Sequence, residues 1–160
     1  MNILSVVIPA YNEENGVAEV IERVLSVNDE MKKVGLDGLE LIIVDDGSKD
    51  KTPDIVASYA DRGVRLIRHK VNKNYGGAIK TGFRHAKGDY LAFMDADGTY
   101  PPEFYPKMFE ALIAHDADLV IGSRALGERQ KGSMTPQQIF GNWLATRILK
   151  YRYGAEFTDL

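Results

Sequence analysis

The stretch LELIIVDDGS, residues 39–48, decides how this chain folds. Its apolar run is interrupted only by Glu40 and ends in two acids followed by Gly47 and Ser48, which is typical of a buried strand that runs into a tight turn. Similar short apolar runs occur at residues 3–8, 64–67 and 90–94, and a fifth begins at residues 118–121. Because these runs are continuous rather than alternating, they predict strands of a mostly parallel sheet that is covered on both faces.

Helical segments separate the predicted strands. An apolar pattern of three- and four-residue spacing follows Asn12, which we expect to cap a helix that begins at Glu13. We expect Thr52 to cap a short helix with Pro53 at its first position. Further helices are predicted over residues 75–86, after residues 101–102 and over residues 136–153. This alternation predicts an α/β fold of the Rossmann-like kind, with helices on both faces of the sheet.

The composition restricts the class of protein. The chain has 160 residues, with 20 lysines and arginines against 23 acidic residues and no cysteine. This length fits a single domain over residues 1–160, which we expect to be truncated at its C-terminus. The lack of cysteine excludes a disulfide framework, a thiolate zinc site and a cysteine nucleophile. A net charge of −3 argues against a general nucleic-acid-binding protein, and no apolar run is long enough to span a membrane.

Polar residues follow four of the predicted strands, at residues 10–13, 45–48, 95–98 and 122–124. Ligands of open parallel sheets bind beyond the carboxyl ends of the strands. We therefore expect these four segments to form one site, which contains acids, glycines and Arg124.

Asp95 and Asp97 lie two residues apart at the end of a predicted strand, so both side chains can face the same side. Two carboxylates on one side repel each other unless a cation or a proton lies between them. Their hard oxygens suit Mg²⁺ or Mn²⁺ and leave coordination positions for substrate phosphates and water. The pair therefore predicts a divalent metal site, and the alternative is a pair of acids that merely follows a strand.

Two other segments leave alternatives open. The pair Asp45 and Asp46 can serve the tight turn, or one of them can accept hydrogen bonds from a base or a ribose. The small residues of segment 74–78 can bind an anion at a helix start or can pack the helix closely against the sheet. The three histidines, His69, His85 and His115, share no spacing with other ligand types, and we expect them to be surface or helix residues without a chemical role.

The predicted helix over residues 136–153 has two interpretations. Core packing is the simpler one, since apolar side chains recur along it, whereas a basic amphipathic helix can also lie on an anionic membrane surface. The apolar residues are Ile139, Phe140, Trp143, Leu144, Ile148 and Tyr151, and the basic residues are Arg147, Lys150 and Arg152.

Four motifs occur in the order VVIPAYNEE (residues 6–14), IVDDGSKDKT (43–52), FMDADG (93–98) and VIGSR (120–124). Together they resemble the family 2 inverting glycosyltransferases of the GT-A fold. The likeness is greatest to the dolichyl-phosphate mannose synthase and polyprenyl-phosphate glycosyltransferase branch, which NYGG at 74–77 and GN at 141–142 also match. The resemblance covers nearly the whole chain and implies a nucleoside-diphosphate sugar as the donor.

The resemblance also implies which residues bind the nucleotide. By this likeness the pocket is lined by Pro9, Ala10, Tyr11 and Glu13, and Asp46 contacts the base or ribose side.

A second group of residues is implied for the phosphates. Asp95 and Asp97 hold the diphosphate through Mg²⁺ or Mn²⁺, with Ala96 packed against the nucleotide, and Arg124 and Lys131 meet phosphate charge.

We therefore expect a metal-dependent hexosyltransferase that moves a sugar, with inversion, from a GDP- or UDP-linked donor to an acceptor. Asp97 and Arg124 are the expected catalytic residues, because negative charge grows on the leaving diphosphate. A polyprenyl-phosphate acceptor is already ionised, whereas a saccharide hydroxyl needs a general base, for which Asp159 is the candidate within the chain.

Two other functions remain open at this point. DADGT, residues 95–99, imitates the nucleophile motif of haloacid-dehalogenase-type phosphatases, although three predicted strands precede it. A non-catalytic nucleotide-binding module is the other alternative. Since the lack of cysteine fits a reducing compartment, we expect a cytoplasmic enzyme of cell-envelope glycan synthesis, or one at the cytoplasmic membrane face if the helix over 136–153 contacts lipid.

Overall fold

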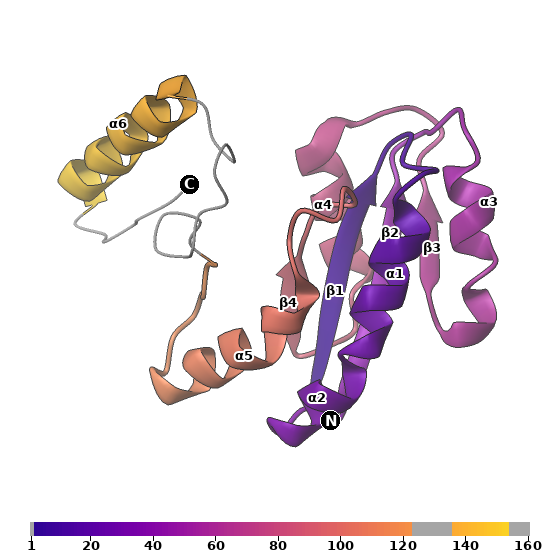
Figure 1. The fold of residues 1–160 in the computed structure, drawn as a ribbon, viewed down its shortest axis with the longest axis horizontal. Coiled ribbons are helices and arrows are strands. Elements are labelled where there is room, and N and C mark those ends of the chain that lie inside the picture. The colour runs from indigo at the N-terminus through magenta and orange to yellow at the C-terminus, as the bar shows by residue number, and fades with distance from the viewer. Residues whose placement is uncertain (1, 123–135, 154–160) are drawn as a thin grey trace. The chain divides into compact units, whose positions relative to one another are not determined.

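The computed structural model describes residues 2–122 and 136–153. Its contacts divide the chain into two compact units, residues 1–117 and residues 118–160, and each is described by itself. The first unit contains the sheet, and the described part of the second contains one long helix (Figure 1).

Four parallel strands form the sheet of the first unit, in the order β3-β2-β1-β4 (Figure 1). The two central strands pair along their whole length, from Ile3 opposite Gly38 to Ala10 opposite Asp45. The predicted parallel sheet is therefore confirmed, with small shifts at the strand ends. The strands are β1 (Ile3–Ala10), β2 (Gly38–Asp45), β3 (Arg65–Arg68) and β4 (Tyr90–Phe93).

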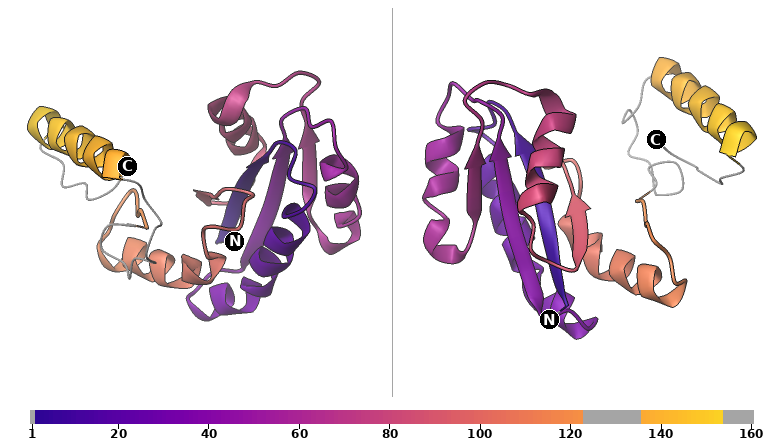
Figure 2. Two further views of the ribbon diagram at one scale, coloured as in Figure 1. Left: turned by 45° about the horizontal axis from the view of Figure 1, so that its top comes forward. Right: turned by 180° about the vertical axis from the view of Figure 1, so that it is seen from behind.

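Helices cover both faces of this sheet, as predicted. Figure 1 shows α1 in front of the sheet, and the view from behind in Figure 2 shows α4 across the opposite face. The helices are α1 (Val17–Ser26), α2 (Asn28–Lys33), α3 (Thr52–Ala57), α4 (Asn74–His85) and α5 (Tyr105–Ala114), with short 3₁₀ turns η1 (Ala60–Arg62) and η2 (Pro102–Phe104).

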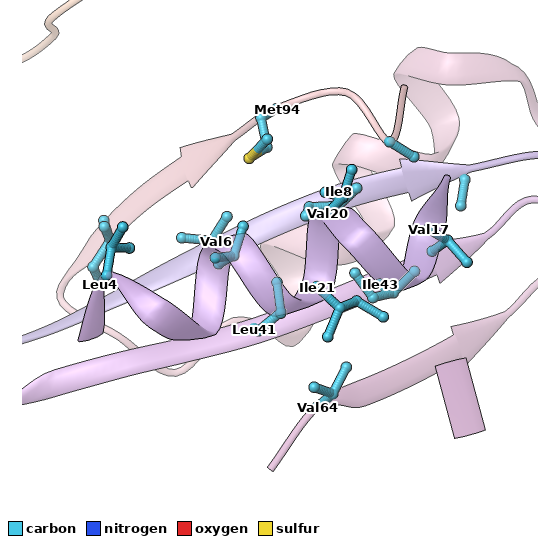
Figure 3. Packing of buried hydrophobic residues seen from close by; sticks show 14 of the residues in the cluster. Leu4, Val6, Ile8, Val17, Val20, Ile21, Leu41, Ile43, Val64 and Met94 are labelled. Atoms are coloured by element: carbon cyan, nitrogen blue, oxygen red, sulfur yellow. The ribbon is translucent and has the colours of Figure 1, made fainter. Parts of the chain in front are cut away.

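The larger core lies between α1 and the sheet (Figure 3). Side chains alternate along a strand, so every second residue of β1 and β2 faces α1. Each of these aliphatic side chains contributes about 1.5–3 kcal/mol when it is fully buried. The residues that meet there include Val6, Ile8, Val17, Val20, Ile21, Leu41 and Ile43, all at most 2% exposed.

The smaller core lies between α4 and the other face of the sheet, where Val7, Ile42 and Val44 pack with Ala78. Gly82 brings α4 close to β1, because a Cβ atom at this position would lie 2.2 Å from Val7 Cγ1. Alternate residues of each continuous apolar run thus face opposite sides of the sheet, and each side is buried in one of the two cores.

Both predicted helix caps are wrong. α1 begins later than predicted, at Val17, and Asn12 has a φ of +56° with its Oδ1 accepting the backbone N–H of Lys49 at 2.9 Å. Thr52 does not precede α3 but is its first residue, and its own N–H donates to Asp50 Oδ1 at 3.0 Å. Both side chains are used in contacts between loops, which local sequence patterns do not reveal.

The second unit contains α6 (Pro136–Tyr153), which confirms the predicted last helix. The predicted fifth strand over residues 118–121 is wrong, because residues 119–122 are irregular and Leu119 and Ile121 are exposed. An apolar run forms a strand only where a neighbouring strand accepts and donates its backbone hydrogen bonds. Across residues 2–122 and 136–153, no helix has the length and apolar character that crossing a bilayer requires.

Candidate functional site

The carboxyl ends of β1, β2 and β4 lie next to one another at one edge of the sheet (Figure 1). Ala10 is paired with Asp45 across β1 and β2, and Val7 is paired with Phe93 across β1 and β4. The loop after β1 therefore lies between the acids that follow β2 and those that follow β4. Three of the four polar segments predicted to form a site are brought to this edge.

Reciprocal hydrogen bonds join the loop after β1 to the loop after β2. The backbone N–H groups at positions 12, 13 and 14 donate to Ser48 Oγ at 2.9 Å, Thr52 Oγ1 at 2.8 Å and Asp50 Oδ2 at 3.1 Å, respectively. In the opposite direction, the Lys49 N–H donates to Asn12 Oδ1. Because these three backbone N–H groups already donate hydrogen bonds within the protein, a ligand at this loop has to bind to other atoms.

The four residues predicted to line a nucleotide pocket lie in this first loop or at the end of β1. Pro9 and Ala10 are buried at the end of the strand, whereas Tyr11 is 45% exposed and Glu13 is half-buried. The loop thus offers a ligand the ring of Tyr11 and the carboxyl group of Glu13.

The adjacent acids Asp45 and Asp46 have different environments. Asp45 is fully buried and its Oδ1 accepts the Ser48 N–H at 3.0 Å, which is the hydrogen bond that the tight turn requires. Its Oδ2 lies 3.1 Å from Arg68 Nε in an ion pair that lacks hydrogen-bond geometry. Asp45 therefore serves the turn, whereas Asp46, itself 3% exposed, has its hydrogen-bond partners outside the turn.

His69 is the partner of Asp46, and its predicted surface position is wrong. The histidine follows β3 directly, is 5% exposed, and has its Nδ1 2.6 Å from Asp46 Oδ1. Its Nε2 lies 2.9 Å from Thr81 Oγ1 on α4. This arrangement could hardly be predicted from the sequence, because the two partners of His69 lie 23 and 12 positions away from it along the chain. The only available signal was its position at the carboxyl end of a strand.

Asp95 and Asp97 lie directly after β4, where the sequence placed them. The Tyr75 hydroxyl donates to Asp95 Oδ1 at 2.7 Å, while Asp97 Oδ1 accepts the N–H and the hydroxyl of Thr99 at 2.9 and 2.8 Å. In the described part of the chain, neither carboxylate pairs with a lysine or an arginine. Ala96, between them, is 3% exposed and packs into the core, so any contact it makes to a nucleotide comes from its backbone.

Negative charge accumulates at this edge. Burial, followed by the charges of Asp97, Asp50 and Asp95, raises the pKa of Glu13 above its ordinary value. Burial and the hydrogen bond to Asp95 raise the pKa of Tyr75 well above its ordinary value, so this hydroxyl remains a donor at neutral pH. Within residues 2–122 and 136–153, no three His, Cys, Asp or Glu side chains are grouped so that they could hold a metal ion. An ion at Asp95 and Asp97 needs additional oxygen ligands from a bound molecule or water.

Segment 74–77 begins α4 beside this edge. Asn74 has a φ of +64°, and Gly76 has open space around its missing side chain. At Gly77, a Cβ atom would lie 2.8 Å from Lys73 Cβ. The crowding at Gly77 involves Lys73 and not the sheet, whereas the next residue, Ala78, is fully buried against Val7 and Ile42. Close packing on the sheet is therefore confirmed for Ala78, and ligand contact by this segment stays a prediction.

Three predicted site residues, Arg124, Lys131 and Asp159, lie outside the described residues. The structure therefore assembles the acidic part of the predicted site and gives no position for its basic part or for the candidate base.

Comparison with known proteins identifies the chain's relatives. The family model described as "Glycosyl transferase family 2" matches residues 5–159. The low-salt glycan biosynthesis hexosyltransferase Agl6 of Haloferax volcanii is 40% identical over 157 residues, which are 98% of this chain and 36% of the relative. The dolichol-phosphate mannosyltransferase of Saccharomyces cerevisiae is 39% identical over 123 residues, which are 75% of this chain and 44% of the relative. The chain thus spans less than half the length of these two relatives.

Solved structures of sugar transferases are also similar to this chain. A mannosyltransferase of Pyrobaculum calidifontis in complex with GDP-Man and Mn²⁺ has a TM-score of 0.56 at 26% identity, covering 68% of this chain and 32% of that protein. The glucosyl-3-phosphoglycerate synthase of Mycobacterium tuberculosis, in complex with Mn²⁺, UDP-glucose and phosphoglyceric acid, has a TM-score of 0.54 at 28% identity, covering 69% and 39%. These matches do not support the phosphatase alternative, whose nucleophile motif belongs on a first strand, whereas Asp95 follows β4.

Proposed function

The chain belongs to glycosyltransferase family 2, and on that premise we propose that it transfers a sugar from a nucleoside-diphosphate sugar to an acceptor, with inversion. The observation that carries the proposal is the acid pair Asp95 and Asp97 at the carboxyl edge of a parallel sheet, without a lysine or arginine partner in the described part of the chain. Nucleotide ligands of such sheets bind at this edge.

The residues at Asp95 and Asp97 fit a divalent ion. Each carboxylate has one oxygen engaged by Tyr75 or Thr99, and its second oxygen has no partner among the described residues. Hard carboxylate oxygens are the ligands that Mg²⁺ and Mn²⁺ prefer. The pKa of the neighbouring Glu13 is raised first by burial and then by the negative charges of Asp97, Asp50 and Asp95. We propose Mn²⁺ or Mg²⁺ here, because two related structures contain Mn²⁺. When bound, such an ion supplies positive charge to the donor's diphosphate.

The nucleoside of the donor is proposed to lie over the loop after β1. Pro9 and Ala10 form the buried floor of this loop, and the exposed ring of Tyr11 offers a flat apolar surface for a base or a ribose. Glu13 and Asp46 are the carboxylates from which we expect acceptor oxygens for the same nucleoside. Each of these contacts is an expectation from the positions of the residues at the edge.

The chemical step breaks the bond between the anomeric carbon and the diphosphate. Negative charge grows on the leaving group, and groups that stabilise this charge lower the barrier. We propose that Arg124 and Lys131 contribute cationic side chains for this purpose, as an arginine can bind a phosphate through two parallel hydrogen bonds. Asp97 would hold the divalent cation, which would supply further positive charge to the diphosphate.

The acceptor is proposed to be a polyprenyl phosphate or a saccharide. A relative named dolichol-phosphate mannosyltransferase supports the first alternative. A phosphate oxygen is already ionised and attacks the sugar without a general base, whereas a saccharide hydroxyl needs a base such as Asp159. Membrane contact through α6 would suit a polyprenyl acceptor, and Trp143 and Tyr151 are exposed aromatic side chains of the kind that lie at membrane interfaces.

Isothermal titration calorimetry of the 160-residue chain with UDP-glucose, UDP-N-acetylglucosamine and GDP-mannose, with and without Mn²⁺, tests the proposal. We expect one donor to bind only with Mn²⁺, and Asp97→Asn to weaken this binding by at least about tenfold. Asp61→Asn, an exposed acid in η1 before β3, is the matched control and should leave binding unchanged. Binding that is independent of Mn²⁺ and unchanged in Asp97→Asn would contradict the proposed site.

A transfer assay separates an enzyme from a binding module. The full-length protein that contains this chain is incubated with the donor that binds and with a short polyprenyl phosphate or a saccharide, and sugar transfer is followed by mass spectrometry. Transfer supports the proposed enzyme, whereas binding without transfer to either acceptor supports the nucleotide-binding module.

A further inference from the structure

His69 is a buried histidine that the proposed transfer reaction does not use. It follows β3 directly, and its backbone N–H donates to the carbonyl oxygen of Asp45 at 2.9 Å. Its ring lies between Asp46 Oδ1, 2.6 Å from Nδ1, and Thr81 Oγ1, 2.9 Å from Nε2. The ring therefore connects the end of β2 to α4 and is held at both of its nitrogens.

One oxygen of Asp46 has both of its acceptor positions occupied. An ionised carboxylate can only accept hydrogen bonds, so the proton between Asp46 and His69 lies on Nδ1. The backbone N–H of Lys73 donates to the same oxygen, Oδ1, at 2.8 Å. Two donors fill the two lone pairs of this oxygen, and Oδ1 has nothing left to offer a ligand.

The other oxygen of Asp46 remains available. Among the described residues, Oδ2 has no hydrogen-bond partner. Asp46 is 3% exposed, and its Oδ2 is not among the fully buried side-chain atoms of the described residues that lack a partner, which are Asp45 Oδ2 and Tyr105 Oη. Asp46 thus presents one acceptor oxygen in a fixed orientation at the edge of the sheet.

We propose that His69 is a positioning residue through which the nucleotide site selects a uracil-type base over guanine. This inference rests on the proposed function, and it names the nucleotide that the same site takes. The pairing edge of uracil or thymine has one donor, N3–H, between two carbonyl oxygens. One free carboxylate oxygen matches that donor, whereas a second free oxygen would face a carbonyl oxygen and be repelled.

Guanine requires a different partner. Its N1–H and N2–H groups are neighbouring donors, which a carboxylate matches best with both oxygens at once, as in other bidentate pairs. With Oδ1 occupied by His69 and Lys73, one of these donors loses its partner when the base is desolvated. A buried donor without a partner costs binding free energy, so the site discriminates against guanine.

Two substitutions at position 69 separate the contact to Asp46 from the contact to Thr81. An asparagine amide can replace Nδ1, so His69→Asn keeps a donor toward Asp46. A glutamine amide reaches the position of Nε2, so His69→Gln keeps the contact to Thr81 and leaves Asp46 Oδ1 without its ring partner. His115→Gln, at an exposed histidine after α5, is the control for the loss of an imidazole.

Calorimetry with UDP, dTDP and GDP in the presence of Mn²⁺ is the experiment, with thermal unfolding of each variant measured alongside. We expect UDP and dTDP to bind the unmodified chain at least about tenfold more tightly than GDP. His69→Asn and His115→Gln should keep this preference, whereas His69→Gln should reduce it to within about threefold. A purely structural role would lower the affinity for all three nucleotides by the same factor.

Each other outcome has a defined meaning. If GDP binds as tightly as UDP to the unmodified chain, the inference is overturned while the proposed function stands. If His69→Gln loses affinity for UDP and GDP equally, His69 does not set the preference and the inference is overturned. If none of the three nucleotides binds, the proposed function fails, and the inference falls with it.

Discussion

The hydroxyl of Tyr75 donates a hydrogen bond to Asp95 Oδ1 at 2.7 Å and so links the first turn of α4 to the end of β4. The two residues are 20 positions apart, and Tyr75 is half exposed. Burial and the hydrogen bond to Asp95 raise the pKa of Tyr75, so its hydroxyl stays protonated and able to donate to Asp95 Oδ1. Hydrogen bonds of this kind to a metal-binding carboxylate orient it and tune its affinity for the metal.

Removal of this hydroxyl is expected to weaken the proposed metal-dependent binding. In Tyr75→Phe, Asp95 keeps its charge but loses the group that orients it, and we expect Mn²⁺-dependent donor affinity to fall by about tenfold. Calorimetry measures this change. Tyr59→Phe, next to η1, removes a phenol hydroxyl away from the carboxyl edge and should leave donor affinity unchanged. Equal affinities in Tyr75→Phe and the unmodified chain would show that this contact does not orient Asp95.

The parallel sheet could be predicted from the sequence because each strand carries its own signal. The residues of β1 and β2 are buried on both faces, and a strand buried in this way needs a continuous apolar run, which is visible without knowledge of its neighbours. The acids after β2 and β4 could be placed at the site for the same reason, since a residue that follows a parallel strand lies at the carboxyl edge.

Arg23 of α1 fixes the loop that follows Asp97. Its guanidinium donates to the Gly98 carbonyl oxygen at 3.2 Å and to both carboxylate oxygens of Glu103, at 3.2 and 3.1 Å. We expect Arg23→Gln to release this loop and to weaken Mn²⁺-dependent donor binding by about threefold to tenfold, because the position of Asp97 depends on it. Calorimetry and thermal unfolding of the same sample are the measurements.

The matched control for Arg23 is another bidentate ion pair of α1. Arg62 donates to both carboxylate oxygens of Glu22, in a pair that has no contact to the loop after Asp97. Exposed ion pairs contribute little to stability, so Arg62→Gln and Arg23→Gln should lower thermal stability to a similar small extent. Only Arg23→Gln should change donor affinity, and an equal change in both variants would contradict the assigned role.

Contacts between distant residues could not be predicted from the sequence. Asn12 and Thr52 both have the side chains of helix caps, but each binds the other loop, because the fold brings the loops after β1 and β2 together. The local sequence of His69 indicates only that it follows a strand, because Asp46 precedes it by 23 positions and Thr81 follows it by 12. Helix and cap propensities describe a segment in isolation. The side chains of Asn12, Thr52 and His69 instead form hydrogen bonds with residues that are distant in the sequence.

Gly82 is expected to be essential for the packing of α4 on β1. A Cβ atom there would lie 2.2 Å from Val7 Cγ1 and 2.9 Å from Val7 Cγ2, so Gly82→Ala forces the helix away from the sheet. We expect a loss of about 1–3 kcal/mol in the free energy of unfolding, measured with urea. Gly76→Ala, in the same helix but with open space around the new methyl group, should be neutral or stabilising by up to about 1 kcal/mol. Equal stability of the two variants would show that α4 adapts without cost.

Glu40 makes the stability of the first unit depend on pH. Burial alone would raise the pKa of Glu40, but hydrogen bonds from the Ser5 hydroxyl, the Lys87 N–H and Arg65 outweigh it and hold this pKa below its ordinary value. A carboxyl group whose pKa is lower in the folded state stabilises the fold fully above its unfolded pKa, and this stabilisation is lost as the pH falls through the folded pKa. We therefore expect the free energy of unfolding in urea to decrease as the pH falls below about 4.5, the ordinary value for a glutamate.

In Glu40→Gln this part of the decrease should be absent, and the variant should be less stable than the unmodified chain at pH 7, where the ionised Glu40 keeps all its partners. Glu30→Gln, at an exposed glutamate of α2, should retain the full decrease, and an unchanged pH dependence in Glu40→Gln would contradict the prediction.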